Sequence, residues 1–271
     1  MLSKITGGPT TLLFTATVLN KYPVKYYRCN ETGFIQTEEA YWLEEAYSSA
    51  ITKLDIGLPY RNILLADAVE KILLKNFNSD GRFLDYAGGY GLFTRIMRDK
   101  GFDFYNTDKY CQNIFAEYFD LKNIDSKKFE LVTAFEVMEH LSDPYQELSE
   151  MLSYSDNLLF TTALQPKAEL KGVDDWWYFI PETGQHIALH TEASLKYIAQ
   201  KLGYQFYTNS VDWHLFTKKS LAKDPFVTER ESFLVRKARK FLKKHDAKEY
   251  PKRETLLQRD WEMIKTKLTD K

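Results

Sequence analysis

The chain of 271 residues is predicted to fold as an α/β protein with helices on both faces of a mostly parallel, seven-stranded sheet whose last strand is antiparallel. Apolar segments of strand length alternate with helical patterns between residues 82 and 202, which is typical of a parallel sheet with crossover helices. The first of these strands runs directly into a glycine-rich turn. The last two strands follow each other without a helix between them. With 44% apolar residues, the chain can bury a core of that size.

The segment before the sheet, residues 1–75, is expected to form a cover of strands and helices. Two strands are predicted at residues 11–19 and 24–29, because a turn-prone Asn-Lys-Tyr-Pro sequence separates two apolar stretches. Helices are predicted at residues 38–51 and 62–74, where apolar side chains recur at helical spacing.

Residues 76–220 are predicted to form the main domain. Its strands are expected at residues 82–86, 102–107, 115–119, 129–135, 157–163, 204–209 and 213–218. Helices are expected at residues 92–100, 143–151 and 191–202. Asp143 and Pro144 begin the second of these helices as an N-cap residue followed by a proline, and Gly203 ends the third.

The remaining segment, residues 221–271, is predicted to be a basic helical tail. Residues 220–271 contain 15 basic and 9 acidic side chains, and residues 229–244 have the pattern of an amphipathic basic helix. One interpretation is a peripheral contact with an anionic membrane surface or with a partner enzyme. The alternative is a helix docked on its own domain with its charges in solvent.

The overall composition argues against several classes of protein. The formal net charge is −1, from 37 basic and 38 acidic residues, so no nucleic-acid partner is expected. Cys29 and Cys111 are the only cysteines and lie far apart in the sequence, which argues against a disulfide framework and favours a cytoplasmic location. No stretch approaches the roughly 20 apolar residues of a membrane span.

The glycine-rich turn at residues 85–91 is the first functional signal. A strand that enters glycines and then a helix lets the backbone approach a ligand closely at the carboxyl end of the strand. The dinucleotide pattern G-x-G-x-x-G needs a glycine or alanine three residues after Gly91, and the chain has Thr94 there. A nicotinamide-dependent oxidoreductase is therefore the less favoured interpretation.

An acid at the strand end followed by glycines at alternate positions resembles class I S-adenosylmethionine-dependent methyltransferases, as does the segment 134–144. The resemblance implies a Rossmann-like three-layer fold and S-adenosyl-L-methionine as the cofactor. Ala87 stands at the first glycine position, where it is tolerated if its φ is negative. The cofactor-binding residues expected from these motifs are Asp85, Ala87, Gly88, Gly89, Gly91, Phe135 and Glu136.

Three further residues are expected to bind the cofactor. Asp108 ends the second strand, where an acid can accept hydrogen bonds from both ribose hydroxyls. In the resembling family an acid near the third strand contacts the adenine amino group, and Asp120 fits that place. The guanidinium of Arg61 matches the methionyl carboxylate of the cofactor, although a solvated or helix-pairing arginine is an equal alternative.

The segment 165–190 is predicted to be an acceptor lid, because it is too long for a simple connector and rich in aromatic residues. The aromatic rings of Trp176, Trp177 and Tyr178 are expected to stack on the substrate, the alternative being that they pack the lid. His186 is the first candidate for the base that takes a hydroxyl proton, and His190, just before a helix, is the second catalytic candidate.

The Trp-Trp-Tyr and Gly-Gln-His sequences of this lid resemble a bacterial methyltransferase subgroup associated with polysaccharide biosynthesis. The predicted function is therefore methyl transfer from S-adenosylmethionine to a small-molecule or glycan acceptor, at oxygen. No metal is expected, because a sulfonium donor releases a neutral thioether. The alternative is a divalent cation bound by Glu136, Glu139 and His140, whose spacing resembles that of a cation site in a few related methyltransferases, with His186 or His190 as a further ligand. An inactive or regulatory cofactor-binding module is the main alternative.

Overall fold

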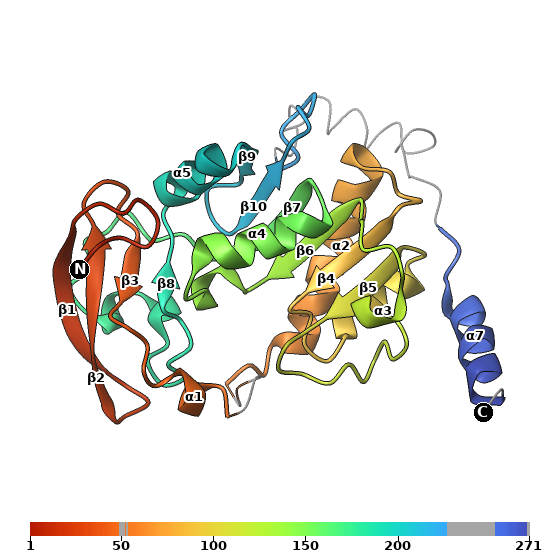
Figure 1. Ribbon diagram of the computed structural model, residues 1–271, viewed down its shortest axis with the longest axis horizontal. Helices are drawn as coiled ribbons and strands as arrows, with labels where there is room; N and C mark the ends of the chain where they lie inside the picture. The colour runs from red at the N-terminus through yellow and green to blue at the C-terminus, as the bar shows by residue number, and fades with distance from the viewer. Residues whose placement is uncertain (49–51, 53, 227–252, 270–271) are drawn as a thin grey trace, which may run out of the picture.

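The computed structural model describes residues 1–48, 52, 54–226 and 253–269. Its centre is a six-stranded sheet with the strand order β5-β4-β6-β7-β10-β9 (Figure 1). The strands are β4 (Arg82–Tyr86), β5 (Asp103–Thr107), β6 (Leu131–Phe135), β7 (Asn157–Thr161), β9 (Gln205–Thr208) and β10 (Trp213–Thr217). β5, β4, β6 and β7 run parallel, whereas β10 is antiparallel to both of its neighbours. The predicted α/β class with a mostly parallel sheet is confirmed.

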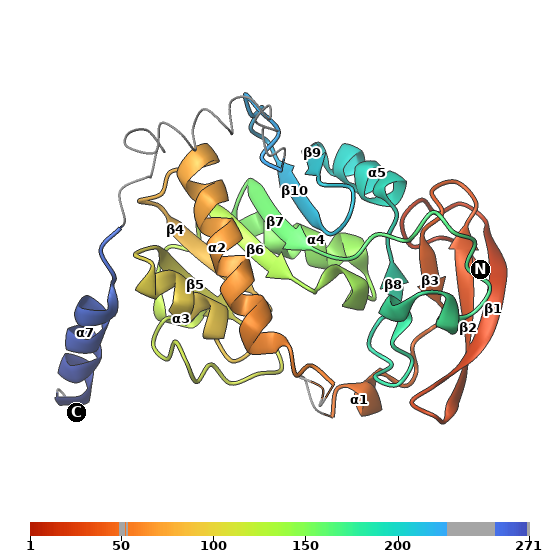
Figure 2. The same cartoon turned by 180° about the vertical axis from the view of Figure 1, so that it is seen from behind.

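Helices cover both faces of this sheet, because successive side chains of a strand point to opposite sides. Phe83 and Leu131 pack with α2 (Leu58–Asn76) and α3 (Leu92–Asp99) on one face. The next residues along the same strands, Leu84 and Val132, pack with α4 (Pro144–Tyr154) and α5 (Glu192–Leu202) on the other (Figures 1 and 2). The helix expected at residues 62–74 is thus part of α2 and packs on the large sheet.

A second, four-stranded sheet joins the N-terminal segment to the lid. It has the strand order β1-β2-β3-β8 and is antiparallel throughout. Its strands are β1 (Thr10–Val18), β2 (Tyr22–Cys29), β3 (Ile35–Thr37) and β8 (Ala188–Leu189). Because β8 comes from the segment 165–190, the lid is anchored as a strand of this sheet.

Two predicted elements differ in the structure. Residues 115–119 form no strand, and only an isolated parallel bridge joins Asn106 to Asp120. The reason is chain length: the segment between Thr107 and residue 115 is too short for the crossover of a dozen or more residues that a parallel neighbour needs. The sheet among the described residues therefore has six strands, and the prediction of seven is wrong.

The helix predicted at residues 38–51 is also shorter than expected. α1 spans only Leu43–Ala46, and residues 49–51 lie outside the described part of the chain. The indole of Trp42 is buried and its Nε1 donates a hydrogen bond of 2.8 Å to the carbonyl oxygen of Gly184. This contact with the lid fixes the chain before α1, so tertiary packing overrides the local helix propensity.

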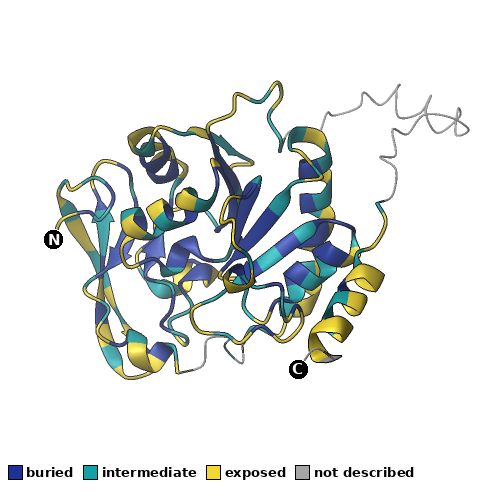
Figure 3. Ribbon diagram, turned by 45° about the vertical axis from the view of Figure 1, so that its right-hand side comes forward, coloured by how far each residue is buried: buried dark blue, intermediate teal, exposed yellow. Residues whose placement is uncertain are grey.

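The described end of the tail is a helix, α7 (Leu257–Thr269), which exposes most of its surface (Figure 3). The buried guanidinium of Arg98 on α3 holds Asp260 through two hydrogen bonds of 2.8 Å. The amphipathic basic helix expected at residues 229–244 lies outside the described residues. Among the described helices, none has both the length and the apolar character that crossing a membrane requires.

Candidate active site

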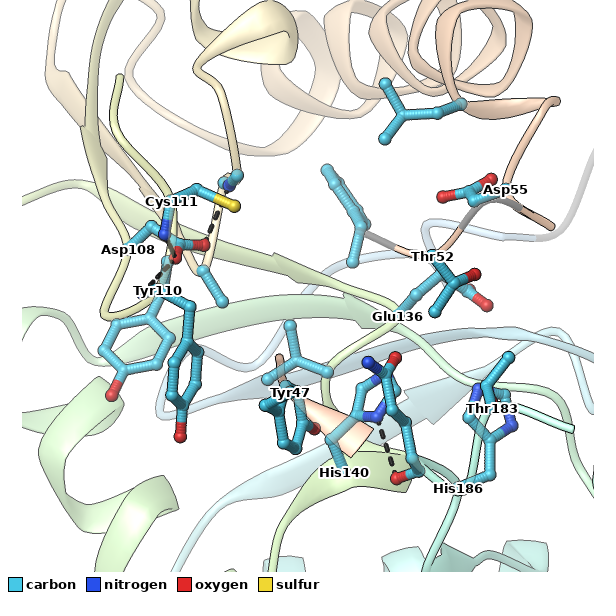
Figure 4. A pocket seen from close by; sticks show the side chains of 18 of the residues that line it. Tyr47, Thr52, Asp55, Asp108, Tyr110, Cys111, Glu136, His140, Thr183 and His186 are labelled. Carbon is cyan, nitrogen blue, oxygen red and sulfur yellow. Dashed lines mark hydrogen bonds between the residues drawn. The ribbon is translucent and has the colours of Figure 1, made fainter. Parts of the chain in front are cut away.

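A cavity of about 910 Å³ opens at the carboxyl ends of β4, β5 and β6, between the start of α2 and the lid. Its size falls within the range of small-molecule and cofactor pockets. Asp108 and Tyr110 lie at one end, here named the donor end after the expected cofactor, and His140 and His186 lie at the other, named the acceptor end after the expected substrate (Figure 4). This position is where parallel α/β sheets bind their ligands.

The glycine turn lines this cavity and leaves no space for side chains at two positions. A Cβ atom on Gly88 would stand 2.1 Å from Asn106 Oδ1 and 2.3 Å from Asp85 Oδ2. A Cβ atom on Gly91, where φ is +81°, would stand 2.1 Å from Asn113 Oδ1. No side chain fits at either position, so the structure requires glycine at both.

Ala87 adopts a left-handed backbone conformation, with φ of +55°. The condition under which alanine would be tolerated here, a negative φ, is therefore not met. The glycines that follow, Gly89 and Gly91, also have positive φ, so the turn bends the same way at each of these alternate positions. A non-glycine residue in this region costs about 1–2 kcal/mol, which leaves Ala87 as a point of backbone strain beside the cavity.

Asp108 organises the donor end through backbone amides. Its Oδ2 accepts a hydrogen bond of 2.9 Å from the amide of Gly89, and its Oδ1 accepts two of 2.7 Å from the amides of Tyr110 and Cys111. A carboxylate has about four acceptor positions. Asp108 thus links the glycine turn to the loop after β5 and keeps limited capacity for a ligand hydroxyl.

Asp85 lies beneath this turn, buried at the end of β4. Thr133 Oγ1 donates a hydrogen bond of 2.9 Å to its Oδ1. Burial raises the pKa of Asp85 to about 7, and the nearby charge of Asp108 acts in the same direction. Asp85 therefore supports the turn from below, at an electrostatic cost when it is ionised.

Sequence reasoning did not identify an aromatic pair at the donor end. The rings of Tyr47 and Tyr110 stack with a centroid separation of 4.9 Å and an interplanar angle of 11°. Both residues line the cavity (Figure 4). Tyr110 follows Asp108 by two residues, which is a usable signal, but Tyr47 arrives from the end of α1 and no local pattern marks it.

The acceptor end begins at Glu136, directly after β6. Its φ is +54°, and Thr161 fixes it by donating a hydrogen bond of 2.7 Å from Oγ1 to its Oε1. The hydroxyl of Tyr178 in the lid donates a hydrogen bond of 3.2 Å to its Oε2. Burial raises the pKa of Glu136 to about 7, and the charge of Glu139 contributes. The lid and the sheet thus meet at this carboxyl group.

His186 stands beside Tyr178 and His140 in the wall of the cavity (Figure 4). Its Nδ1 lies 2.6 Å from the carbonyl oxygen of Tyr178. A carbonyl only accepts hydrogen bonds, so Nδ1 carries the hydrogen and Nε2 keeps a free lone pair. Burial lowers the pKa of His186 to about 3, with His140 adding to the effect, so the imidazole is neutral near pH 7.

Phe135, Trp177 and Tyr178 also line the cavity, as expected. Arg61 lines it too, but its guanidinium forms a two-pronged ion pair with Asp55, at 3.0 and 2.8 Å. The structure thus pairs this guanidinium with a carboxylate of the chain itself in the segment before α2, and binding of the cofactor carboxylate by Arg61 stays a prediction.

Gly91 ends the glycine turn but does not line the cavity, and three further expected site residues do not reach it. His190 is fully buried, with Nδ1 3.3 Å from Ser194 Oγ and Nε2 3.4 Å from the carbonyl oxygen of Met138, so it has a structural position. Trp176 packs against Tyr178 and Phe179 inside the lid.

Asp120 is the third of these residues. Its Oδ1 accepts a hydrogen bond of 3.1 Å from Asn113 Nδ2, and it caps the short 3₁₀ helix Leu121–Asn123. Since no crossover helix precedes it, the loop after β5 returns directly alongside Asn106 and turns Asp120 away from the cavity.

A family model described as a methyltransferase domain matches residues 59–209. The match covers more than half of the chain and includes the glycine turn, Asp108, Glu136 and the lid. The chain therefore belongs to the methyltransferase domain family. The methyltransferase family that the motifs predicted is confirmed.

Similar solved structures include CalO1, a methyltransferase of calicheamicin biosynthesis in its SAH-bound form, at 14% identity and a TM-score of 0.38, over 67% of this chain and 60% of that one. An O-methyltransferase family protein from Burkholderia thailandensis matches at 11% identity and a TM-score of 0.43, over 60% and 57%. SAH-bound magnesium protoporphyrin IX methyltransferase from Synechocystis PCC 6803 matches at 15% identity and a TM-score of 0.41, over 64% of this chain and 90% of that one.

The chain thus spans 60% and 57% of the first two of these structures. No curated protein matches the sequence. The assignment to the family rests on the family model.

Proposed function

We propose that this protein transfers a methyl group from S-adenosylmethionine to a hydroxyl group of a small-molecule or glycan acceptor. One observation carries the proposal: a single cavity joins the glycine turn and Asp108 to a polar wall formed by Glu136, Tyr178 and His186. A donor held at the first end and a hydroxyl held at the second would face each other without leaving the cavity.

The donor end fits a nucleoside with a charged tail. Asp108 offers its remaining acceptor capacity to a ribose hydroxyl, and the Tyr47–Tyr110 pair offers aromatic surface to a base. The left-handed turn at Ala87 to Gly91 brings backbone close to the ligand.

Transfer itself is an in-line displacement. The acceptor oxygen attacks the methyl carbon, the carbon–sulfur bond breaks, and its electron pair stays on sulfur as a neutral thioether. Glu136 and the Nε2 atom of His186 are the groups in the wall that can receive the hydroxyl proton. Positioning of the two reactants supplies most of the rate enhancement.

The rim of the cavity favours an acceptor with a ring. Trp177 lines the cavity and is 73% exposed, so its indole is available to stack on a sugar or an aromatic ring. The resemblance of the lid to a glycan-associated subgroup supports a sugar acceptor. The two free cysteines support a cytoplasmic enzyme.

The test is methyl transfer from labelled S-adenosylmethionine to a panel of sugars, phenols and amines, with mass spectrometry locating the methyl group. We expect an O-methyl product, and a turnover about 10²–10⁴-fold lower for His186→Ala. Trp177→Ala, at the exposed rim, should raise KM for the acceptor and leave cofactor affinity unchanged. A product methylated only at nitrogen or carbon would refute the hydroxyl acceptor.

A further inference from the structure

Three side chains that can ligate a metal converge beside the acceptor end of the cavity. One ligand atom from each of Glu139, His140 and His186 lies within 4.8 Å of the other two. His140 Nε2 and Glu139 Oε1 are 3.9 Å apart. An ion bound at about 2.0–2.2 Å from each ligand spans that separation.

Glu139 is the unusual member of this cluster. It is 0% exposed, and neither oxygen of its carboxylate has a hydrogen-bond partner among the described residues. The nearby hydroxyl of Tyr178 has one hydrogen and donates it to Glu136. A buried carboxylate without a hydrogen bond or a counter-ion is costly, so this position calls for a positive partner.

In the described part of the chain, the imidazole of His140 lies 3.9 Å from this carboxylate and is a positive partner only when it is protonated. Arg61 is the cation whose charge acts on both Glu136 and Glu139, but its guanidinium is engaged by Asp55 in two hydrogen bonds. Glu136 and Glu139 thus lie close together, while the guanidinium of Arg61 is paired with Asp55.

The two histidines are oriented as metal ligands. His140 Nδ1 lies 3.0 Å from the carbonyl oxygen of Gln185, and His186 Nδ1 lies 2.6 Å from that of Tyr178. Each Nδ1 therefore carries the hydrogen, which leaves the Nε2 lone pair free to ligate. Metal-binding histidines usually donate their second ring N–H to a carbonyl or carboxylate in this way, which fixes the ring.

The geometry points to a binding site for one divalent transition-metal cation, formed by Glu139, His140 and His186. Two imidazoles and one carboxylate suit a first-row ion such as Zn²⁺ or Co²⁺ better than Mg²⁺ or Ca²⁺, which prefer oxygen ligands. His140 and His186 line the cavity, so the open coordination positions of the ion face it. A cation there neutralises Glu139 and presents a Lewis acid to the acceptor end.

This site changes what is expected of His186. The sequence indicates a proton acceptor, whereas in the metal-bound protein its Nε2 is a ligand and the cation holds the acceptor oxygen. This second role rests on the proposed function, and the cation site itself does not. Measuring metal binding without donor or acceptor therefore separates the two.

The experiment titrates the full chain, stripped with chelator and dialysed, with Zn²⁺ in a calorimeter and with Co²⁺ by visible absorption. We expect one ion per chain and cobalt d–d bands. Glu139→Gln, His140→Ala and His186→Ala should each weaken binding at least about 10–100-fold, since even the outer-shell partners of a metal contribute that much. Glu147→Gln removes a different carboxylate from the cavity wall and should bind like the parent.

Thermal unfolding shows whether each variant still folds. Without metal, Glu139→Gln should unfold at a higher temperature than the parent, because it removes an unpaired buried charge. With Zn²⁺ the parent should gain stability and the variant should not. Absence of Zn²⁺ and Co²⁺ binding by the folded parent, or unchanged binding in the Glu139 and His186 variants, would overturn the site. Loss of methyl transfer with metal binding intact would count against the proposed function alone.

Discussion

The two ends of the cavity are built in different ways. Most of the donor end consists of residues that directly follow a strand: the glycine turn follows β4, Asp108 follows β5, and a backbone amide of the turn joins the two. The acceptor end is assembled from distant segments. Glu136 follows β6, Tyr178 and His186 belong to the lid, and the lid is attached to the N-terminal sheet through β8.

The comparison shows which kind of change each end tolerates. The donor end depends on backbone conformation, so it is sensitive to any added atom. The acceptor end depends on contacts between distant segments such as that of Trp42 with Gly184, so it is sensitive to the packing of a side chain far from the chemistry.

Replacing Gly88 with alanine should have the largest effect. The new Cβ would overlap Asn106 Oδ1 and Asp85 Oδ2, so the turn must shift. We expect S-adenosylmethionine affinity to fall about 100-fold, in line with overpacking costs of about 1–3 kcal/mol. Calorimetry measures it. Gly172→Ala is the matched control, because nothing lies within 4 Å of its Cβ position. Equal affinities for both variants would contradict the role of the turn.

Asp85→Asn should show that the buried carboxyl group of Asp85 destabilises the folded protein when it is ionised. Burial raises the pKa of Asp85 to about 7 when folded, whereas an unfolded aspartate titrates near ~3.9. The folded state holds the proton more tightly, so the contribution of Asp85 to stability falls as pH rises from about 4 to about 7. Asparagine does not titrate.

The stability of Asp85→Asn relative to the parent should therefore increase between pH 5 and pH 8, by about 2–3 kcal/mol. Urea unfolding of both proteins at the two pH values measures this change. A difference that stays constant with pH would mean that Asp85 is not the group responsible.

Trp42→Phe should affect the acceptor end alone. It removes the donor to the Gly184 carbonyl, which costs about 1–3 kcal/mol when the acceptor stays buried. We expect faster amide hydrogen exchange at residues 181–190 and a higher KM for the acceptor, with cofactor affinity unchanged. Trp177→Phe, at the exposed rim, should leave exchange as in the parent. A weaker cofactor complex in Trp42→Phe would show that the two ends are coupled.

Ala87→Gly should have the smallest effect. Relief of the left-handed strain is offset in part by the greater freedom of glycine in the unfolded chain, so we expect a gain of at most about 1 kcal/mol. Ala66→Gly, in the middle of α2, should instead lower the free energy of unfolding by about 1 kcal/mol. Urea midpoints distinguish them, and a loss of stability in both would mean that Ala87 is not strained.

The same division explains how far the sequence could predict the site. Asp85, Gly88 and Asp108 could be predicted to line one cavity because each follows a strand at a fixed distance, and parallel strands bring such positions together. Asp120 does not line the cavity because the strand after which it was expected, at residues 115–119, does not form. Tyr47 and Asp55 were missed, since no local pattern in their segments indicates that they line the cavity.

By itself, then, the sequence determined the α/β class, the limits of most strands and helices, and the donor end, because periodicity, caps and glycine turns are local properties of the chain. Only the tertiary structure decided that the lid forms a strand of the N-terminal sheet, that His190 is buried while His186 lines the cavity, and that the buried Glu139 has no hydrogen-bond partner among the described residues. Burial and the approach of segments far apart in sequence decide these features, and no local pattern encodes them.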